Sequence, residues 1–180
     1  MKGTLFLFVG NSGSGKDSII KEVLKDNDSI IAPKRIITRE KHESEDCICV
    51  GRKEFEVLKN NNRFALHWES YDKLYGIPKE MDDYLEEGKN VLVNVSRDII
   101  KEARERYPNL KVIFIYVPLD TAKKRIVSRN REGNSEIDVR IRRAEEMKEF
   151  NDYDYLINNN REISDAAEEV KNIIFSFGNI

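Results

Sequence analysis

The fold of this 180-residue chain is decided by Gly10-Asn11-Ser12-Gly13-Ser14-Gly15-Lys16. The apolar run 5–9 before this stretch predicts a buried strand, and the spacing of apolar residues in 19–24 predicts a helix packed on one side. Between a strand and a helix, such glycines let backbone N–H groups surround an anion, and Lys16 can reach the outer phosphates of a nucleotide. We interpret the stretch as a phosphate-binding loop; the alternative is a glycine turn with a surface lysine.

Asp17 stands where this loop pattern usually has Ser or Thr, and Ser18 follows it. A carboxylate so close to bound phosphates would repel them unless a cation lay between, so we expect Asp17 to face Mg²⁺ directly or through water. The alternative is a first-turn helix residue favoured by the helix dipole. Kinases with this loop commonly carry a metal-binding Asp on a neighbouring strand, yet Val91–Val95 has only Asn94 as a polar residue. We hypothesise that one acidic contact has moved from the strand to the loop.

The rest of the chain alternates between apolar runs and helix-prone segments. After the loop and its helix, the pattern predicts strands at 91–95, 112–117 and 155–157 and helices at 98–106, 121–129, 136–150 and 163–175. The first two of these strands are almost wholly apolar, as in a parallel sheet covered on both faces. The predicted class is therefore α/β, a three-layer sandwich around a parallel sheet.

A different pattern occupies the chain between the first helix and Val91. Short alternating segments at 35–38, 46–50 and 63–68 surround a short helix near 53–59. We interpret residues 34–88, approximately, as a region inserted into a single domain that spans residues 1–180. A polar turn near Gly133 lies between two predicted helices, and residues 128–143, approximately, are interpreted as a helical flap.

The composition narrows the function classes. The 31 Lys and Arg residues and 33 Asp and Glu residues nearly balance, which gives no support for an electrostatic nucleic-acid binder. No signal peptide or membrane-spanning run is recognisable, so we expect a cytoplasmic protein, either monomer or homodimer. Cys47 and Cys49 are interpreted as reduced thiols, because residues two apart on an extended segment lack the geometry of a usual disulfide and His42 alone does not complete a zinc site.

Two groups of arginines are candidates for binding anions. Arg129, Arg131 and Arg140 in the flap could stabilise charge on a transferring phosphoryl group, although a solvated helix face is the simpler interpretation for Arg125 and Arg142. Arg35, Arg39 and Arg97 could hold a second anion opposite the loop. If that anion is a phosphate, it is already a nucleophile, and the reaction needs alignment more than a general base.

Together these features resemble the guanylate kinase group of P-loop kinases, and the resemblance covers nearly the whole chain. Within that group the chain is more similar to ribose 1,5-bisphosphate phosphokinases, which make 5-phosphoribosyl diphosphate from ATP and ribose 1,5-bisphosphate. The similarity rests on Gly15-Lys16-Asp17-Ser18, Ile37-Thr38-Arg39, Ser44-Glu45-Asp46, Trp68, Tyr75-Gly76, Asn94-Val95-Ser96-Arg97 and Asn134-Ser135-Glu136-Ile137 with Arg140. Val95 departs from the glycine that is usual there, and the segment before Ser44 is shorter.

The resemblance implies a role for each candidate residue. The loop from Gly10 to Ser18 would bind ATP and its Mg²⁺, and Asn158 would contact the adenine edge. Arg129 and Arg140 would bind the transferring phosphate, and Arg35, Arg39, Tyr75, Asn94 and Arg97 would hold a small phosphorylated acceptor. Guanylate kinases have a phosphate-binding tyrosine where this chain reads Cys47-Ile48-Cys49-Val50. Glu45 falls where a guanine-contacting acid lies, so a nucleoside monophosphate kinase acting on GMP is the main alternative, and a non-catalytic binding module is a weaker one.

Overall fold

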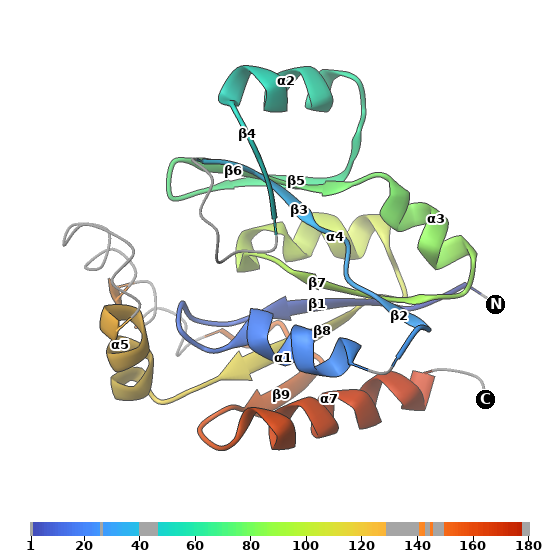
Figure 1. Cartoon of the computed structure of the whole chain (residues 1–180). Coiled ribbons are helices and arrows are strands. Elements are labelled where there is room, and N and C mark those ends of the chain that lie inside the picture. The colour runs from blue at the N-terminus through green and yellow to red at the C-terminus, as the bar shows by residue number, and fades with distance from the viewer. Residues whose placement is uncertain are drawn as a thin grey trace.

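A five-stranded parallel sheet forms the centre of the computed structural model (Figure 1). The structure describes residues 2–25, 27–39, 47–128, 141–142, 145 and 150–177. The strands are β2 (Ile30–Ile31), β7 (Asn90–Asn94), β1 (Leu5–Val9), β8 (Lys111–Tyr116) and β9 (Tyr155–Asn158), in that spatial order. Each neighbouring pair is parallel. The carboxyl ends of these strands therefore meet at one edge of the sheet, where α/β proteins bind their ligands.

Helices cover both faces of this sheet, and alternate side chains of β1 pack against different helices. Phe6 and Phe8 pack in one cluster with residues of α1 (Lys16–Leu24) and α7 (Ile163–Phe177). Leu5, Leu7 and Val9 pack on the other face with residues of α3 (Glu80–Glu86) and α4 (Ile100–Arg106). A strand buried on both faces is the pattern of a parallel sheet between two helical layers. The predicted three-layer α/β fold is confirmed.

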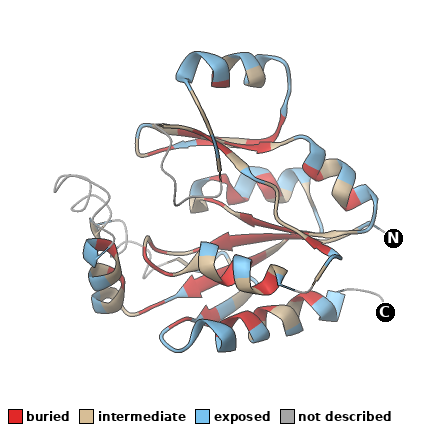
Figure 2. Ribbon diagram, in the orientation of Figure 1, coloured by how far each residue is buried: buried red, intermediate tan, exposed pale blue. Residues whose placement is uncertain are grey.

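A second sheet lies beside the central one, with α2 (Arg52–Asn60) on its outer side (Figure 1). Its order is β4 (Cys47–Val50), β3 (Arg35–Thr38), β6 (Lys73–Pro78) and β5 (Phe64–Ser70). Strands β3 and β4 are parallel, whereas β6 is antiparallel to β3 and to β5. Ile36 and Phe55 belong to a small core under α2, while Trp68 and Ile77 join the main core (Figure 2). The opposite face of β3, which carries Arg35, is therefore turned away from α2.

Most of the helices and strands in the structure agree with those predicted from the sequence, and three further elements were not predicted. The strands predicted at 91–95, 112–117 and 155–157 are shifted by one residue at most at either end, and α5 spans Leu119–Ser128. The segment 98–106 begins as a 3₁₀ turn, η1 (Arg97–Ile99), before α4. The predictions omitted β2, β6 and α3. Strand β6 contains Gly76 and Pro78 and depends on pairing with strands on both sides, which local sequence does not reveal. Most of the helix predicted at 136–150 lies outside the described residues.

Gly76 allows the small core under α2 to close onto the second sheet. A Cβ atom at this position would lie 2.4 Å from the Phe64 ring. That ring stacks on Phe55 of α2 with centroids 4.6 Å apart, so it has little room to retreat. Any larger residue at Gly76 must therefore displace the aromatic pair that attaches α2.

We expect Gly76→Ala to lower the free energy of unfolding by about 1–3 kcal/mol, because the added methyl group overpacks the Phe64 ring. Urea denaturation followed by circular dichroism measures the change. Gly51→Ala is the matched control, since a Cβ there meets nothing within 4 Å; because Gly51 is the N-cap of α2, it should cost only the difference in capping preference, less than about 1 kcal/mol. Equal effects of the two substitutions would contradict this account of the packing.

Candidate active site

The glycine loop, residues 10–16, connects β1 to α1 at the carboxyl edge of the central sheet. Gly10 and Gly15 have φ angles of +145° and +90°, a region that side chains other than glycine rarely adopt. A Cβ at Gly10 would lie 2.3 Å from the Ile115 carbonyl oxygen, and one at Gly15 would lie 2.4 Å from Asn159 Nδ2. These glycines are thus required both by backbone conformation and by close packing against the strands beside β1.

The Lys16 side chain folds back and donates hydrogen bonds to the glycine loop itself. Its ammonium donates hydrogen bonds to the carbonyl oxygens of Gly10 and Asn11, at 2.7 Å and 2.9 Å, and contacts the Ser14 hydroxyl at 3.3 Å. Helix α1 begins at Lys16 with Gly15 as its N-cap, which offers no side chain to the first-turn N–H groups. A lysine ammonium and a helix N-terminus therefore converge at one place, and this combination fits the phosphates of a nucleotide.

Asp17, Asn94 and Arg35 form one contact group, although they come from three separate segments. Asp17 Oδ1 accepts hydrogen bonds from Asn94 Nδ2 at 2.7 Å and from Arg35 Nη2 at 3.3 Å. Arg35 Nη1 also donates to the Asn94 carbonyl oxygen at 3.4 Å. The structure brings the loop acid and the strand-end Asn94 together, while the hypothesis that a metal contact has moved from the strand to the loop stays a prediction. Arg35 additionally connects the second sheet to the glycine loop.

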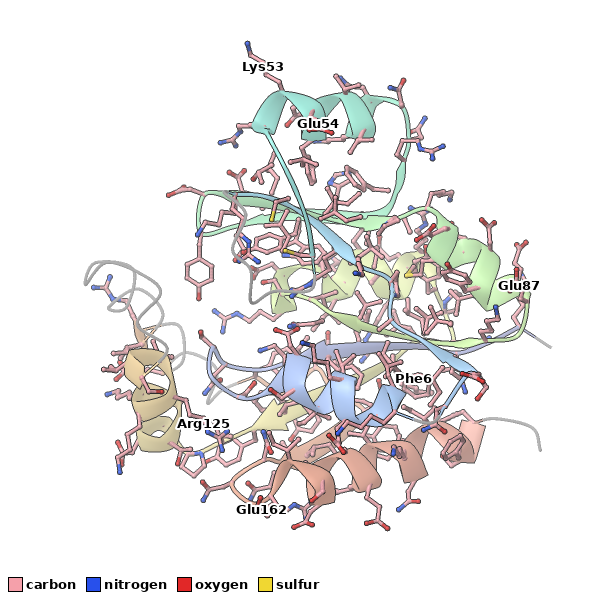
Figure 3. All side chains as sticks on the ribbon, viewed as in Figure 1. Phe6, Lys53, Glu54, Glu87, Arg125 and Glu162 are labelled. Carbon is pink, nitrogen blue, oxygen red and sulfur yellow. The ribbon has the colours of Figure 1, made fainter. Side chains whose placement is uncertain are left out.

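Asn159 and Arg125 hold the loop from its other side, and neither was among the candidate site residues. Asn159 is fully buried, and its Nδ2 donates to the Ser14 carbonyl oxygen at 2.6 Å. Arg125 extends from α5 toward the central sheet (Figure 3) and donates to the carbonyl oxygens of Gly13 and Asn159, at 3.5 Å and 3.3 Å. The interpretation of Arg125 as part of a solvated face is therefore wrong, because its guanidinium contacts the loop.

A sequence signal for Asn159 existed in the alternation of strand β9. Ile157 is buried, so the residue two positions later shares its inward side, whereas the neighbouring Asn158 is exposed. Asn158 Oδ1 accepts a hydrogen bond from the Asn160 backbone N–H at 3.1 Å. The structure thus places Asn158 next to the loop-supporting residue but does not test its predicted contact with adenine.

The predicted acceptor residues lie on and near the second sheet. Arg39 Nη2 donates to Cys47 Sγ at 3.1 Å. Burial lowers the pKa of Arg39, but hydrogen bonds and charge interactions with Cys47 and Cys49 outweigh burial and raise it above its ordinary value. Tyr75 stacks on Trp68 with ring centroids 5.3 Å apart. Arg97 follows the carboxyl end of β7 and forms an ion pair with Asp98 at 3.9 Å.

Four candidate residues lie outside the described part of the chain: Glu45, Arg129, Arg131 and Arg140. Their roles stay predictions, although α5 ends at Ser128, directly before the first of the arginines. Among the residues that the structure describes, no cluster of three or more His, Cys, Asp or Glu side chains is placed to hold a metal ion. Within the same residues, none of the helices is both long enough and apolar enough to span a membrane.

We expect Asn159→Ala to destabilise the chain by about 1–3 kcal/mol, because the buried Ser14 carbonyl oxygen loses its donor. The substitution should also weaken ATP binding, since the loop is then held less firmly. Urea denaturation and isothermal titration calorimetry measure the two effects. Asn160→Ala is the matched control, because Asn160 is exposed and contacts Thr121 rather than the loop. Unchanged stability and affinity in Asn159→Ala would show that the loop keeps its shape without this bond.

Comparison with known proteins shows that the chain is similar to two kinds of kinase. It is 34% identical over 180 residues to the ribose 1,5-bisphosphate phosphokinase PhnN of Azotobacter vinelandii, with 97% of each chain covered. It is 35% identical over 182 residues to the guanylate kinase of Clostridioides difficile, with 97% of this chain and 88% of that one covered. The crystal structure of guanylate kinase from Anaplasma phagocytophilum matches with a TM-score of 0.74 at 22% identity, covering 97% of this chain and 86% of that one.

Overall identity to these two kinds of relative is nearly equal, so it does not choose between their activities. The structural match establishes the fold, including the central parallel sheet flanked by helices. A family model for guanylate kinase matches residues 2–177, which is almost the entire sequence. Members of this family are phosphotransferases, and the expected enzyme class is confirmed. The chain belongs to the guanylate kinase family.

Proposed function

We propose that this chain is an ATP-dependent kinase that phosphorylates the 1-phosphate of ribose 1,5-bisphosphate, giving 5-phosphoribosyl diphosphate. The observation that carries the proposal is the 2.7 Å hydrogen bond between Asn94 and Asp17. These are the two features that set the chain apart from a guanylate kinase pattern, and they form a single unit with Arg35. The similarity to the ribose 1,5-bisphosphate phosphokinases of Azotobacter vinelandii and Thiobacillus denitrificans supports the same function.

The charges of this unit suit an acceptor with two phosphates. Asn94 places a neutral amide at the end of β7, where an acid would repel such an acceptor. Arg35 offsets the charge of the Asp17 carboxylate through its 3.3 Å contact. Arg39, Arg97 and Tyr75 supply further groups for binding the acceptor, and together with the second sheet and α3 they define the region proposed to bind it. Two phosphates on one small sugar need cations on both sides, and these arginines supply them.

The reaction proposed here requires positioning and charge neutralisation. Lys16 and the N-terminus of α1 would hold the outer phosphates of ATP, while Asn158 would contact the adenine. Asp17, with Ser18 beside it, would hold Mg²⁺, which supplies neutralisation of phosphate charge when bound. The acceptor phosphate is an anionic nucleophile and needs no base to activate it. The flap arginines Arg129, Arg131 and Arg140 are proposed to stabilise the transferring group.

Phosphorylation of GMP is the second candidate function. It is favoured by the similarity to the guanylate kinase of Clostridioides difficile over 97% of this chain. Recognition of guanine would need a base-edge partner, and Glu45 is the residue proposed for that role. The two functions share ATP binding by the glycine loop and differ in what the second sheet binds. A non-catalytic role is disfavoured because the loop retains Lys16 together with Asn159 and Arg125, which hold it in place.

The acceptor is identified by measuring ADP release with ATP and Mg²⁺ in the presence of ribose 1,5-bisphosphate, GMP, dGMP, AMP, CMP or UMP. Mass spectrometry of the product establishes which phosphate has been extended. We expect turnover of the sugar bisphosphate at least about 100-fold above any nucleotide, a difference of about 2.7 kcal/mol in transition-state binding. Lys16→Ala should abolish turnover with every acceptor. A preference for GMP that is lost in Glu45→Ala would replace the proposal by the second candidate.

Asp17→Ser tests the proposed metal contact separately from the acceptor. We expect the Mg²⁺ concentration for half-maximal activity to rise by about tenfold, equivalent to about 1.4 kcal/mol of lost binding. The control is Asp120→Ser, since Asp120 is also an acid in the first turn of a helix, α5. If both substitutions lower stability alike and leave the Mg²⁺ requirement unchanged, Asp17 acts only on the helix dipole.

A further inference from the structure

Cys47 and Cys49 form a close thiol pair on the edge of the second sheet. They alternate along β4, so both side chains lie on one face, and their Sγ atoms are 3.6 Å apart. Cys47 is opposite Arg35 and Cys49 is opposite Ile37 in the register with β3, and Ile37 is opposite Tyr75 in β6. The thiols therefore share a face with the residues proposed to bind the acceptor.

Arg39 gives the pair an electropositive neighbour. Its guanidinium donates to Cys47 Sγ at 3.1 Å, so a positive charge lies in direct contact with this sulfur. Both cysteines are free and partly exposed, so small reagents in solvent can reach them. A partly accessible thiol beside a cation, with a second thiol in contact, is the usual arrangement of an oxidation-sensitive cysteine and its resolving partner.

The strand geometry allows a bond between the two sulfurs but makes it strained. Alternate residues on a strand have Cα atoms about 6.4–6.8 Å apart, at the upper end of the range that a disulfide spans. The sulfurs must approach from 3.6 Å to about 2.05 Å. Strand β4 lies at the end of the second sheet and pairs with β3 alone in the described topology, so it can shorten without breaking a second ladder. A strained bond of this kind is readily reduced.

We propose that Cys47 and Cys49 are a reversible oxidation site that takes hydrogen peroxide as its small-molecule oxidant. The Cys47 thiolate attacks one peroxide oxygen, the O–O bond breaks, and hydroxide leaves and takes a proton to become water. The resulting Cys47 sulfenic acid is attacked by Cys49, whose sulfur forms the S–S bond while the S–O bond breaks and the second water leaves. Both thiols lose one hydrogen, and the peroxide is reduced to two waters.

Oxidation changes the surroundings of Arg39. A disulfide sulfur is a weaker hydrogen-bond acceptor than a thiolate, so oxidation weakens the contact between Arg39 and Cys47, and β4 contracts beside Arg35. This consequence rests on the proposed function, in which both arginines bind the acceptor. The oxidised enzyme should have a KM for the acceptor at least about fivefold higher, with a smaller rise in the KM for ATP, which Arg35 transmits through its contact with Asp17.

The chemical step is tested on the intact protein without any assay of activity. Treatment with hydrogen peroxide should lower the intact mass by two hydrogens, peptide mapping should locate a Cys47–Cys49 disulfide, and dithiothreitol should restore the original mass. Cys49→Ser removes the resolving thiol, so dimedone should trap a sulfenic acid on Cys47 in that variant. A mass increase from added oxygen with no disulfide, or no change in mass, would overturn the proposal whatever the acceptor is.

The effect on catalysis is measured with the same preparations. Oxidised wild type should show the raised KM for the acceptor and recover on reduction, whereas Cys47→Ser, which has no thiol beside Arg39 for peroxide to attack, should show the same KM before and after peroxide treatment. An oxidised protein with an unchanged KM would refute the link to Arg39 while leaving the disulfide established. Failure of the reduced protein to turn over ribose 1,5-bisphosphate would refute the proposed function alone, since the mass measurement does not depend on it.

Discussion

The hydrogen bond from the buried Asn159 side chain to the Ser14 carbonyl oxygen sets the shape of the glycine loop, and much of the site depends on it. The bond crosses from the end of β9 to the loop after β1, and it leaves no space for a Cβ at Gly15. With the loop fixed in this conformation, the N-terminus of α1 and the Lys16 ammonium face the same position, where they can bind an anion. Arg125 strengthens the same attachment from α5.

A second set of contacts, made by Arg35, connects the glycine loop to the second sheet, where we propose that the acceptor binds. Arg35 belongs to the second sheet, yet its guanidinium reaches Asp17 at the start of α1 and the Asn94 carbonyl at the end of β7. The face of β3 that it occupies is the one turned away from α2, because Ile36 on the opposite face is buried beneath that helix. Packing of a small apolar core thus decides which charged side chain points at the glycine loop.

Local sequence revealed the elements whose pattern is strong and missed those that depend on distant partners. The loop between an apolar strand and an amphipathic helix was predictable from residues 5–24, whereas the contact between Asp17 and Asn94 follows from the parallel pairing of β1 and β7, which only the structure shows. Strand β6 was not predictable, since Gly76 and Pro78 weaken its local preference and its pairing to β3 and β5 supplies the stability. Asn159 was missed because three consecutive asparagines resemble a polar turn, and only the burial of Ile157 distinguishes the inward one.

Membership of the guanylate kinase family establishes that the chain is a phosphotransferase but not which acceptor it uses. The arrangement of the two sheets accounts for this difference. The residues proposed to bind the nucleotide lie on the central sheet and its helices, and their geometry is fixed by hydrogen bonds to backbone carbonyl oxygens of the loop. The face of the second sheet turned away from α2 carries main-core residues such as Trp68 and partly exposed residues such as Cys47, and only the partly exposed ones can change without repacking the main core. The segment Cys47–Val50 on this sheet has no tyrosine of the kind expected in a guanylate kinase, and its Cys47 contacts Arg39. If the acceptor binds where we propose, substrate choice depends on the face that carries Arg35, Cys47 and Tyr75, and substitutions there should separate one acceptor from another.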